Sequence, residues 1–179
     1  PNGDGEFRSN KLTANKHYAY YYKGDWKDGK KSGSGSVNIY RFIEDIDRMS
    51  RLTELKYSGS FLDDLYECAE CTLEISDDKG GGISYTGGFK SGKFDGFGTY
   101  SALGMIAGMA DDSFVGNFKN GKREGEGKLT YNLEGNTIIY QGIFKDGEII
   151  SGINEEYGPD DKLRYRYEGA FDRFRSGFG

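Results

Sequence analysis

Aromatic residues, glycines and polar residues alternate along the chain in a pattern that recurs. Six times an aromatic residue is followed two positions later by Gly and four positions later by another aromatic residue, starting at Tyr22, Tyr57, Tyr85, Phe114, Tyr140 and Tyr167. Because side chains two apart on a β-strand share a face, each run predicts a strand with one aromatic face and one polar face. The starts differ by 35, 28, 29, 26 and 27 residues, which is the spacing of a supersecondary repeat.

Three copies carry further glycines at +7, +11 and +13 from the leading aromatic residue. They are Tyr22-Gly24-Trp26-Gly29-Gly33-Gly35, Tyr85-Gly87-Phe89-Gly92-Gly96-Gly98 and Phe114-Gly116-Phe118-Gly121-Gly125-Gly127. Pairs such as Asp28-Gly29 and Asn120-Gly121 favour two-residue hairpin turns, so a return strand is expected after each. A glycine inside a strand usually marks a close approach by another group. We therefore expect the rings of one hairpin to lie over the glycines of the next.

These residues resemble the MORN family, whose repeats read Tyr-x-Gly-x-(Phe or Trp)-x-x-Gly-x-x-x-Gly-x-Gly. The resemblance runs from about Tyr22 to Gly179, which leaves residues 1–21 as an N-terminal extension. It implies an all-β fold, a single-layer elongated and twisted antiparallel sheet of consecutive hairpins. It also implies a non-catalytic role, because MORN arrays dock proteins or lie near membranes in junctophilins, phosphatidylinositol phosphate kinases, a lysine methyltransferase and ciliary radial spoke heads.

Three copies depart from the pattern. The second copy has Asp64, Cys68 and Glu70 at the positions +7, +11 and +13 where the complete copies have glycine. The fifth has Ser151 and Ile153 at +11 and +13. In the sixth, Gly177 and Gly179 stand at +10 and +12, one residue before the expected positions. We expect less regular ring stacking at these three places.

Two stretches interrupt the period. Residues 41–56 place Phe42, Ile43, Ile46, Met49, Leu52 and Leu55 mostly three or four apart, a spacing that predicts a short amphipathic helix. This insert would dock a partner or cover its own sheet. Between the third and fourth copies, Leu103, Met105, Ile106 and Met109 with two glycines predict an apolar loop that packs on the sheet edge or adapts to a partner.

Composition narrows the function further. Hydrophobic residues make up 35% of the chain, while it contains 29 glycines, 14 tyrosines and 12 phenylalanines, so backbone and rings must supply the packing. A net charge of -5 disfavours nucleic acid as a partner. Two cysteines are too few for a disulfide scaffold, which favours an intracellular, reducing compartment. On one strand Cys68 and Cys71 would point to opposite faces as small buried side chains, although half a zinc site or a redox pair has the same spacing.

The sequence gives little support for a catalytic function. The run from Gly116 to Gly121-Lys122 resembles a phosphate-binding loop, but Arg123 stands where that loop needs Ser or Thr. The single histidine, His17, leaves no basis for a nucleophilic triad or a four-ligand zinc site. We expect no enzyme activity, no catalytic residues, no cofactor, no metal and no small-molecule substrate.

The favoured function is a scaffold or adaptor within a larger assembly, and family analogy suggests a cytoskeletal or ciliary one. Its partner would bind along an aromatic groove formed by Tyr22, Trp26, Tyr85, Phe89, Phe114 and Phe118. Each of these rings could equally pack between repeats. A first alternative is a tether to anionic membranes through the lysines that flank the turns, namely Lys27, Lys30, Lys90, Lys93, Lys119, Lys122 and Lys145. A second is the regulatory region of a larger enzyme, since the chain opens on Pro1 and stops at Gly179 inside a repeat.

Overall fold

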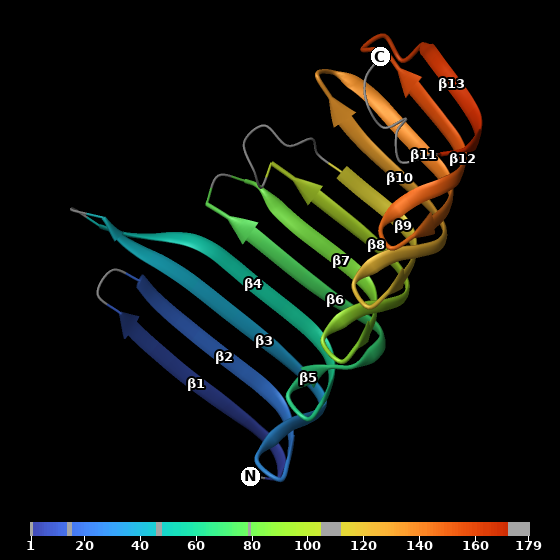
Figure 1. Ribbon diagram of the computed structural model, residues 1–179. Coiled ribbons are helices and arrows are strands. Elements are labelled where there is room, and N and C mark those ends of the chain that lie inside the picture. The colour runs from blue at the N-terminus through green and yellow to red at the C-terminus, as the bar shows by residue number, and fades with distance from the viewer. Residues whose placement is uncertain (1, 14–15, 46–47, 79, 105–111, 172–179) are drawn as a thin grey trace.

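The protein consists of β-strands throughout the part of the chain that the structure, a computed structural model, describes. That part comprises residues 2–13, 16–45, 48–78, 80–104 and 112–171 (Figure 1). The strands are β1 (Gly3–Thr13), β2 (Lys16–Lys27), β3 (Lys30–Asp45), β4 (Arg48–Leu62), β5 (Leu65–Tyr66), β6 (Cys68–Asp77), β7 (Gly82–Lys90), β8 (Lys93–Leu103), β9 (Asp112–Lys119), β10 (Lys122–Leu133), β11 (Asn136–Lys145), β12 (Glu148–Tyr157) and β13 (Leu163–Ala170). Among these residues, no helix is long and apolar enough to cross a membrane.

The strands form one open antiparallel sheet in chain order. Each strand from β1 to β13 pairs with its neighbours in sequence, except that short β5 pairs with the end of β4 while β6 continues the sheet. Figure 1 shows them side by side in a single twisted layer, with β1 at one edge and β13 at the other. The predicted all-β sheet of consecutive hairpins is confirmed. β1 and the start of β2 belong to the same sheet, so the first residues add a strand that the repeat pattern did not predict.

The predicted helix over residues 41–56 is wrong. β3 continues to Asp45 and β4 starts at Arg48, and the two strands pair from Gly33 opposite Phe61 to Asp45 opposite Arg48, with Ile39 opposite Leu55 between them. Of the apolar positions that suggested a helical period, Phe42 and Ile43 belong to β3 and Met49, Leu52 and Leu55 to β4, while Ile46 lies outside the described residues. Cross-strand pairing, which a local period cannot reveal, decides the outcome here.

The hairpin turns form as the Asx-Gly pairs predict. Both turn residues have positive φ in Asp28-Gly29 (48° and 80°), in Ser91-Gly92 (50° and 76°) and in Asn120-Gly121 (52° and 83°). Such angles match the twist of the flanking strands. The second copy makes its turn without glycine, because Asp63 and Asp64 adopt φ of 49° and 72°. The turns that join β2–β3, β4–β5, β7–β8, β9–β10 and β11–β12 lie along one side of the sheet, which we call the turn edge.

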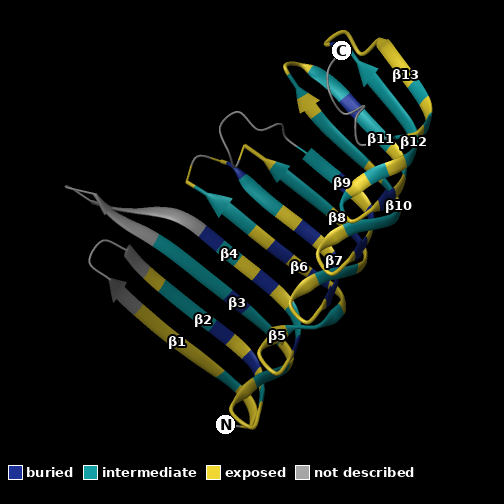
Figure 2. Ribbon diagram, viewed as in Figure 1, coloured by how far each residue is buried: buried dark blue, intermediate teal, exposed yellow. Residues whose placement is uncertain are grey.

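Cross-strand register aligns two rows on one face of the sheet, the ring face. The glycine row contains Gly5, Gly24, Gly35, Gly59, Gly87, Gly98, Gly116, Gly127, Gly142, Gly152 and Gly169, with Cys71 in its place on β6. The ring row beside it contains Phe7, Tyr22, Val37, Tyr57, Leu73, Tyr85, Tyr100, Phe114, Leu129, Tyr140, Asn154 and Tyr167. The core lies over these rows, and Figure 2 shows the buried segments crossing the strands near the turn edge.

The leading rings Tyr22, Tyr85 and Phe114 cover glycines of their own hairpins. A Cβ on Gly98 would lie 2.6 to 2.8 Å from atoms of the Tyr85 ring, and one on Gly35 would lie 2.8 Å from Tyr22. In both cases the two residues belong to one hairpin, so the expectation that rings cover the glycines of the next hairpin is wrong. The close approach behind that expectation is present, but successive hairpins meet through ring-to-ring contacts instead.

Some predicted features lie outside the described residues. They are the apolar loop residues Met105, Ile106 and Met109, and the late glycines of the sixth copy, Gly177 and Gly179.

Candidate functional site

The structure places the six predicted partner-binding rings in or against the core. Tyr22, Tyr85, Phe89, Phe114 and Phe118 are buried, and Trp26 is partly exposed. Each contacts another ring. These contacts establish a packing role, and binding of a partner by the six rings stays a prediction.

The rings form a continuous chain of edge-to-face contacts along the ring face. Its members are Trp26, Tyr22, Phe61, Tyr57, Phe89, Tyr85, Phe118, Phe114 and Phe144, and successive ring centroids lie 5.0 to 5.5 Å apart. Such pairs add about 0.5 to 1.5 kcal/mol each beyond the area they bury. The chain of rings therefore couples each hairpin to the next along the ring face of the sheet.

The second and fifth copies, which depart from the sequence pattern, differ in their ring contacts. In the second copy the ring chain continues without a break. Tyr66 stacks on Tyr57 at 3.8 Å, as Phe94 stacks on Tyr85 at 3.8 Å, so the prediction of irregular ring stacking is wrong there. In the fifth copy, Tyr140 contacts Tyr131 and Phe171 at 6.1 and 5.7 Å. Ring contacts are thus rearranged in the fifth copy, as its sequence predicts.

The hydroxyl groups of three leading tyrosines make hydrogen bonds within their own repeat. The hydroxyl donates to the carbonyl three residues later, from Tyr22 to Asp25 (2.8 Å), from Tyr57 to Ser60 (2.8 Å) and from Tyr85 to Gly88 (2.9 Å). Burial raises the pKa of Tyr22 and of Tyr85 to about 12 in each case. These phenols are held neutral, which suits a structural role and not proton transfer.

Beside the ring row, on the side away from the turn edge, the same face carries an apolar row whose members are partly exposed. We define the apolar row as Tyr20, Ile39, Leu55, Ile75, Ile83 and Ala102, which the register aligns across β2 to β8. Unlike the leading rings Tyr22, Tyr57 and Tyr85 beside them, these side chains retain accessible surface. The line continues across β9 to β12 with Asp112, Tyr131, Ile138 and Glu156, so its C-terminal part is acidic.

Sequence reasoning missed the apolar row, although a signal was present. Tyr20, Leu55 and Ile83 each stand two residues before a leading ring. Extending the strand period by one step would have placed them on the ring face. The repeat pattern itself starts at the leading ring and so does not include these positions.

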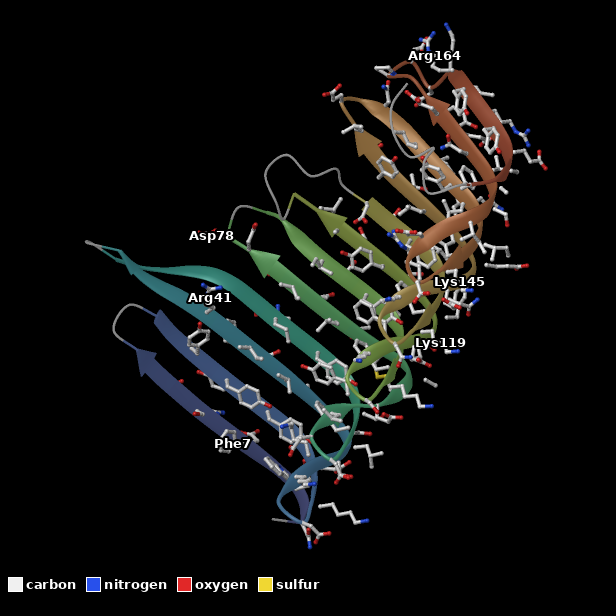
Figure 3. All side chains as sticks on the ribbon, in the orientation of Figure 1. Phe7, Arg41, Asp78, Lys119, Lys145 and Arg164 are labelled. Atoms are coloured by element: carbon white, nitrogen blue, oxygen red, sulfur yellow. A yellow bond between two sulfur atoms is a disulfide. The ribbon has the colours of Figure 1, made fainter. Side chains whose placement is uncertain are left out.

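The turn edge carries charged residues of both signs. All seven lysines of the predicted membrane-binding set are exposed, and Figure 3 shows Lys119 and Lys145 on this side of the sheet. Acidic side chains lie among them, since Lys30 pairs with Asp63 at 3.6 Å and Lys122 with Asp146 at 3.1 Å. The edge is therefore a mixed-charge surface.

The turns at Ser91-Gly92, Asn120-Gly121 and Asp146-Gly147 are also tied to the preceding hairpin by backbone amides. The first turn residue donates its amide to an acidic side chain of the preceding return segment, from Ser91 to Glu67 between β5 and β6 (2.7 Å), from Asn120 to Asp95 of β8 (3.1 Å) and from Asp146 to Glu124 of β10 (3.1 Å). The following glycine donates to a backbone carbonyl of that segment, from Gly92 to Tyr66 (2.9 Å), from Gly121 to Phe94 (2.8 Å) and from Gly147 to Arg123 (3.0 Å). We call this pair of contacts the turn clamp. It fixes the spacing of successive hairpins at the turn edge.

The two cysteines lie on the same side of β6. Cys68 and Cys71 are joined by a disulfide, and the Tyr57 hydroxyl lies 3.2 Å from the Cys71 sulfur. The prediction that they point to opposite faces is wrong, because the register shifts between them. Within the described residues, no group of three or more His, Cys, Asp or Glu side chains could hold a metal ion.

Comparison with known proteins agrees with this geometry. The family model of the MORN repeat matches residues 22–36, 85–102 and 114–132. These segments contain the three complete copies of the pattern. No curated protein matches the chain.

Proposed function

Because the chain is a MORN-repeat protein whose ring face carries a partly exposed apolar row, we propose that it is a non-catalytic scaffold that docks a protein partner along that row. The partner contributes an amphipathic helix or an extended strand, since an apolar stripe on a rigid surface binds both. The single observation that carries this proposal is the difference in exposure between the apolar row and the buried rings beside it.

The dimensions of the row define the segment it takes. Six strands spaced about 4.8 Å apart span roughly 24 Å, which corresponds to about 16 residues of helix or about 7 residues of extended chain. Beyond Ala102 the line meets Asp112 and Glu156. A partner segment with its apolar residues over β2 to β8 and basic residues over β9 to β12 would complement both parts.

The test compares variants that differ in the face they alter. Leu55→Asp and Ile83→Asp place a charge in the apolar row, while Thr86→Asp places one on the opposite face of β7. Full-length protein purified from its source should recover a partner with wild type and with Thr86→Asp, and should lose it with both row variants. Equal recovery by all four proteins, each with an unchanged circular dichroism spectrum, would remove the basis of the proposal.

A membrane tether is the second candidate, and the exposure of all seven turn-edge lysines favours it. Each lysine near an anionic surface would contribute about 1 kcal/mol, but the interleaved carboxylates of Asp63, Asp95 and Asp146 oppose that attraction. Sedimentation with anionic vesicles at two salt concentrations separates the candidates. Strong binding that fades with salt and is lost in Lys119→Glu/Lys122→Glu would favour the tether over the scaffold.

The setting we propose is a large intracellular assembly, cytoskeletal or ciliary, or else a larger enzyme of which this array is the regulatory region. MORN repeats occur in all of these contexts. Fluorescent tagging of the full-length protein, followed by mass spectrometry of the proteins that co-purify with it, distinguishes them.

A further inference from the structure

The cysteine pair of β6 stands where a complete copy carries two glycines. By register, Cys68 takes the place that Gly96 has on β8, and Cys71 takes the place of Gly98. Two residues lie between the cysteines, whereas one lies between the glycines. The register shift at this point turns both cysteines toward the core on the ring face, where they form a disulfide. The second copy therefore holds reactive sulfur atoms at positions that have no side chain in the complete copies.

The two cysteines differ in their access to solvent. Cys71 is 4% exposed, and it is enclosed by Gly59, where a Cβ would collide with its sulfur, and by the Tyr57 hydroxyl. Cys68 is partly exposed, and the two residues that follow it are exposed. A thiolate opens a disulfide by attacking one sulfur, and the other sulfur leaves with the electron pair. Access therefore makes Cys68 the attacked sulfur and Cys71 the leaving one.

A hydrogen-bond donor stands beside the leaving sulfur. The Tyr57 hydroxyl donates to the Ser60 carbonyl at 2.8 Å and lies 3.2 Å from the Cys71 sulfur and 3.8 Å from the Cys68 sulfur. Burial raises the pKa of Tyr57, so the hydroxyl keeps its proton at neutral pH. Rotation of the hydroxyl turns this proton toward Cys71 once that sulfur is charged, because hydrogen bonds to ionised acceptors are the stronger ones. A thiolate stabilised in this way is a better leaving group.

The surroundings of the pair disfavour two other uses of neighbouring cysteines. A structural metal site needs further ligands, and within the described part of the chain no group of three or more His, Cys, Asp or Glu side chains could supply them. A disulfide stabilises a fold mainly in proportion to the loop that it closes. Cys68 and Cys71 are only 3 positions apart in the sequence, so closing this loop adds little to stability.

We propose that the Cys68–Cys71 disulfide of the folded protein is a site of reversible thiol–disulfide exchange with a small-molecule thiol. The small thiolate bonds to the Cys68 sulfur as the bond between the cysteines breaks, and the electron pair leaves on the Cys71 sulfur beside the Tyr57 hydroxyl. A second small thiolate then attacks the sulfur of the first, which releases a small-molecule disulfide and leaves Cys68 as a thiolate. Both protein thiolates take protons from water. The pair thus gains two electrons and two protons while two small thiols become one disulfide, and the reverse reaction closes it again.

The first test follows the pair in the folded chain. The whole chain is oxidised with oxidised glutathione and incubated with reduced glutathione at neutral pH. Free thiols are then trapped with N-ethylmaleimide in urea and counted by intact-mass analysis. The folded protein should gain two labels, and excess oxidised glutathione should reverse the reaction. A pair that resists reduced glutathione until urea unfolds the chain would overturn the proposal, because a structural disulfide behaves in that way.

Single-cysteine variants identify the attacked sulfur. Cys71→Ser leaves Cys68 alone, and oxidised glutathione should convert it to a stable mixed disulfide because no second protein thiol can displace the glutathione. Cys68→Ser leaves the buried Cys71, which should react at least about tenfold more slowly. Circular dichroism checks the fold of both variants, and peptide mapping of the mixed disulfide trapped in wild type makes the same assignment without a substitution. Faster reaction at Cys71, or glutathione mapped to Cys71, would contradict the proposed order of attack.

Tyr57→Phe tests the positioning role of the hydroxyl. It keeps the ring, and it should slow reduction of the pair by glutathione about fivefold. Tyr85→Phe is the matched control, since its hydroxyl donates to the equivalent carbonyl, that of Gly88, at 2.9 Å and has Gly98 where the second copy has Cys71. It should react at the wild-type rate. A loss of structure would alter both rates, so equal slowing in the two variants, or none in Tyr57→Phe, would refute the role of Tyr57 in the exchange.

Discussion

At the scale of single residues, the glycines of the repeat serve two different purposes. Gly98 lies in the glycine row under the Tyr85 ring, with no room for a Cβ. Gly96, two residues earlier, has open space but a φ of 91°, which L-residues with a side chain rarely adopt. Gly98 is therefore required because a side chain would not fit, whereas Gly96 is required because the backbone has a positive φ.

Substitution by alanine should separate the two requirements. Gly98→Ala should destabilise the protein by about 1 to 3 kcal/mol through overpacking, and Gly96→Ala by about 1 to 2 kcal/mol through backbone strain. In double-mutant cycles with Tyr85→Leu, measured by urea denaturation, Gly98→Ala should couple to the ring by about 1 to 3 kcal/mol while Gly96→Ala adds independently. A cycle that shows equal coupling for both glycines contradicts the steric account of Gly98.

The leading tyrosines predict a loss of stability at alkaline pH. The pKa of Tyr85 rises from 10.0 to about 12 in the folded protein, mainly because burial disfavours the phenolate. A raised folded pKa means that the stability contribution is complete below pH 10 and is lost as the pH rises toward 12. Tyr85→Phe, which removes a hydrogen bond worth about 1 kcal/mol at neutral pH, should show a shallower decline above pH 10. Denaturation at a series of pH values, together with tyrosinate absorbance, tests this, and a Tyr85 that titrates near 10 in the folded state would refute it.

At the scale of elements, the turn of the second copy departs from the others without losing its function. Asp64 accepts a hydrogen bond from the Lys31 amide at 3.0 Å and pairs with the Lys31 ammonium at 2.9 Å. The hydrogen bond from that amide is the main cause that lowers the pKa of Asp64 below its ordinary value of 3.8. This carboxylate joins the first and second hairpins where a glycine turn is absent.

Replacing Asp64 by Asn should therefore cost stability in a pH-dependent way. A lowered folded pKa contributes stability above the ordinary value of 3.8 and loses it as the pH falls below that value. Because the pair is partly exposed, Asp64→Asn should cost about 1 kcal/mol or less at neutral pH, and the difference from wild type should vanish in acid. Asp63→Asn is the matched control, since Asp63 has the same left-handed φ and a longer contact with Lys30 at 3.6 Å. Thermal melts that show equal losses for both variants, or a loss for Asp64→Asn that persists in acid, would contradict the assignment.

The sequence predicts the hairpins well and the joins between them poorly. Turn residues such as Asn120-Gly121 act within one hairpin, so their effect is readable locally. The long pairing of β3 with β4, the ring contact of Tyr85 with Phe118 and the register shift that brings Cys68 to Cys71 all depend on residues from more than one strand. A one-dimensional period carries no information about such contacts. For the same reason the sequence could not separate a packing role from a binding role for rings such as Tyr85 and Phe114: the structure shows that both are buried between hairpins, while the apolar row beside them is partly exposed.

At the scale of the whole molecule, the sheet behaves as a one-dimensional array. Apart from short β5, each strand pairs with its sequence neighbours, and the core extends along the ring chain from hairpin to hairpin. In such arrays stability is approximately a sum of unit and nearest-neighbour terms. A lesion in one hairpin should therefore weaken its neighbours and leave distant strands intact.

Phe114 offers the sharpest test of that locality. It is fully buried and contacts Phe118 within its own hairpin at 5.1 Å and Phe144 of the next at 5.0 Å. Phe114→Ala should cost about 3 to 5 kcal/mol of local stability, so hydrogen exchange should speed up in β9 to β12 by the corresponding factor. Exchange in β1 to β3, measured on the same sample by mass spectrometry, should stay within error of wild type. Exchange that rises equally in all strands would show that the sheet opens as one cooperative unit, and nearest-neighbour coupling through the ring chain would then fail as an account of its stability.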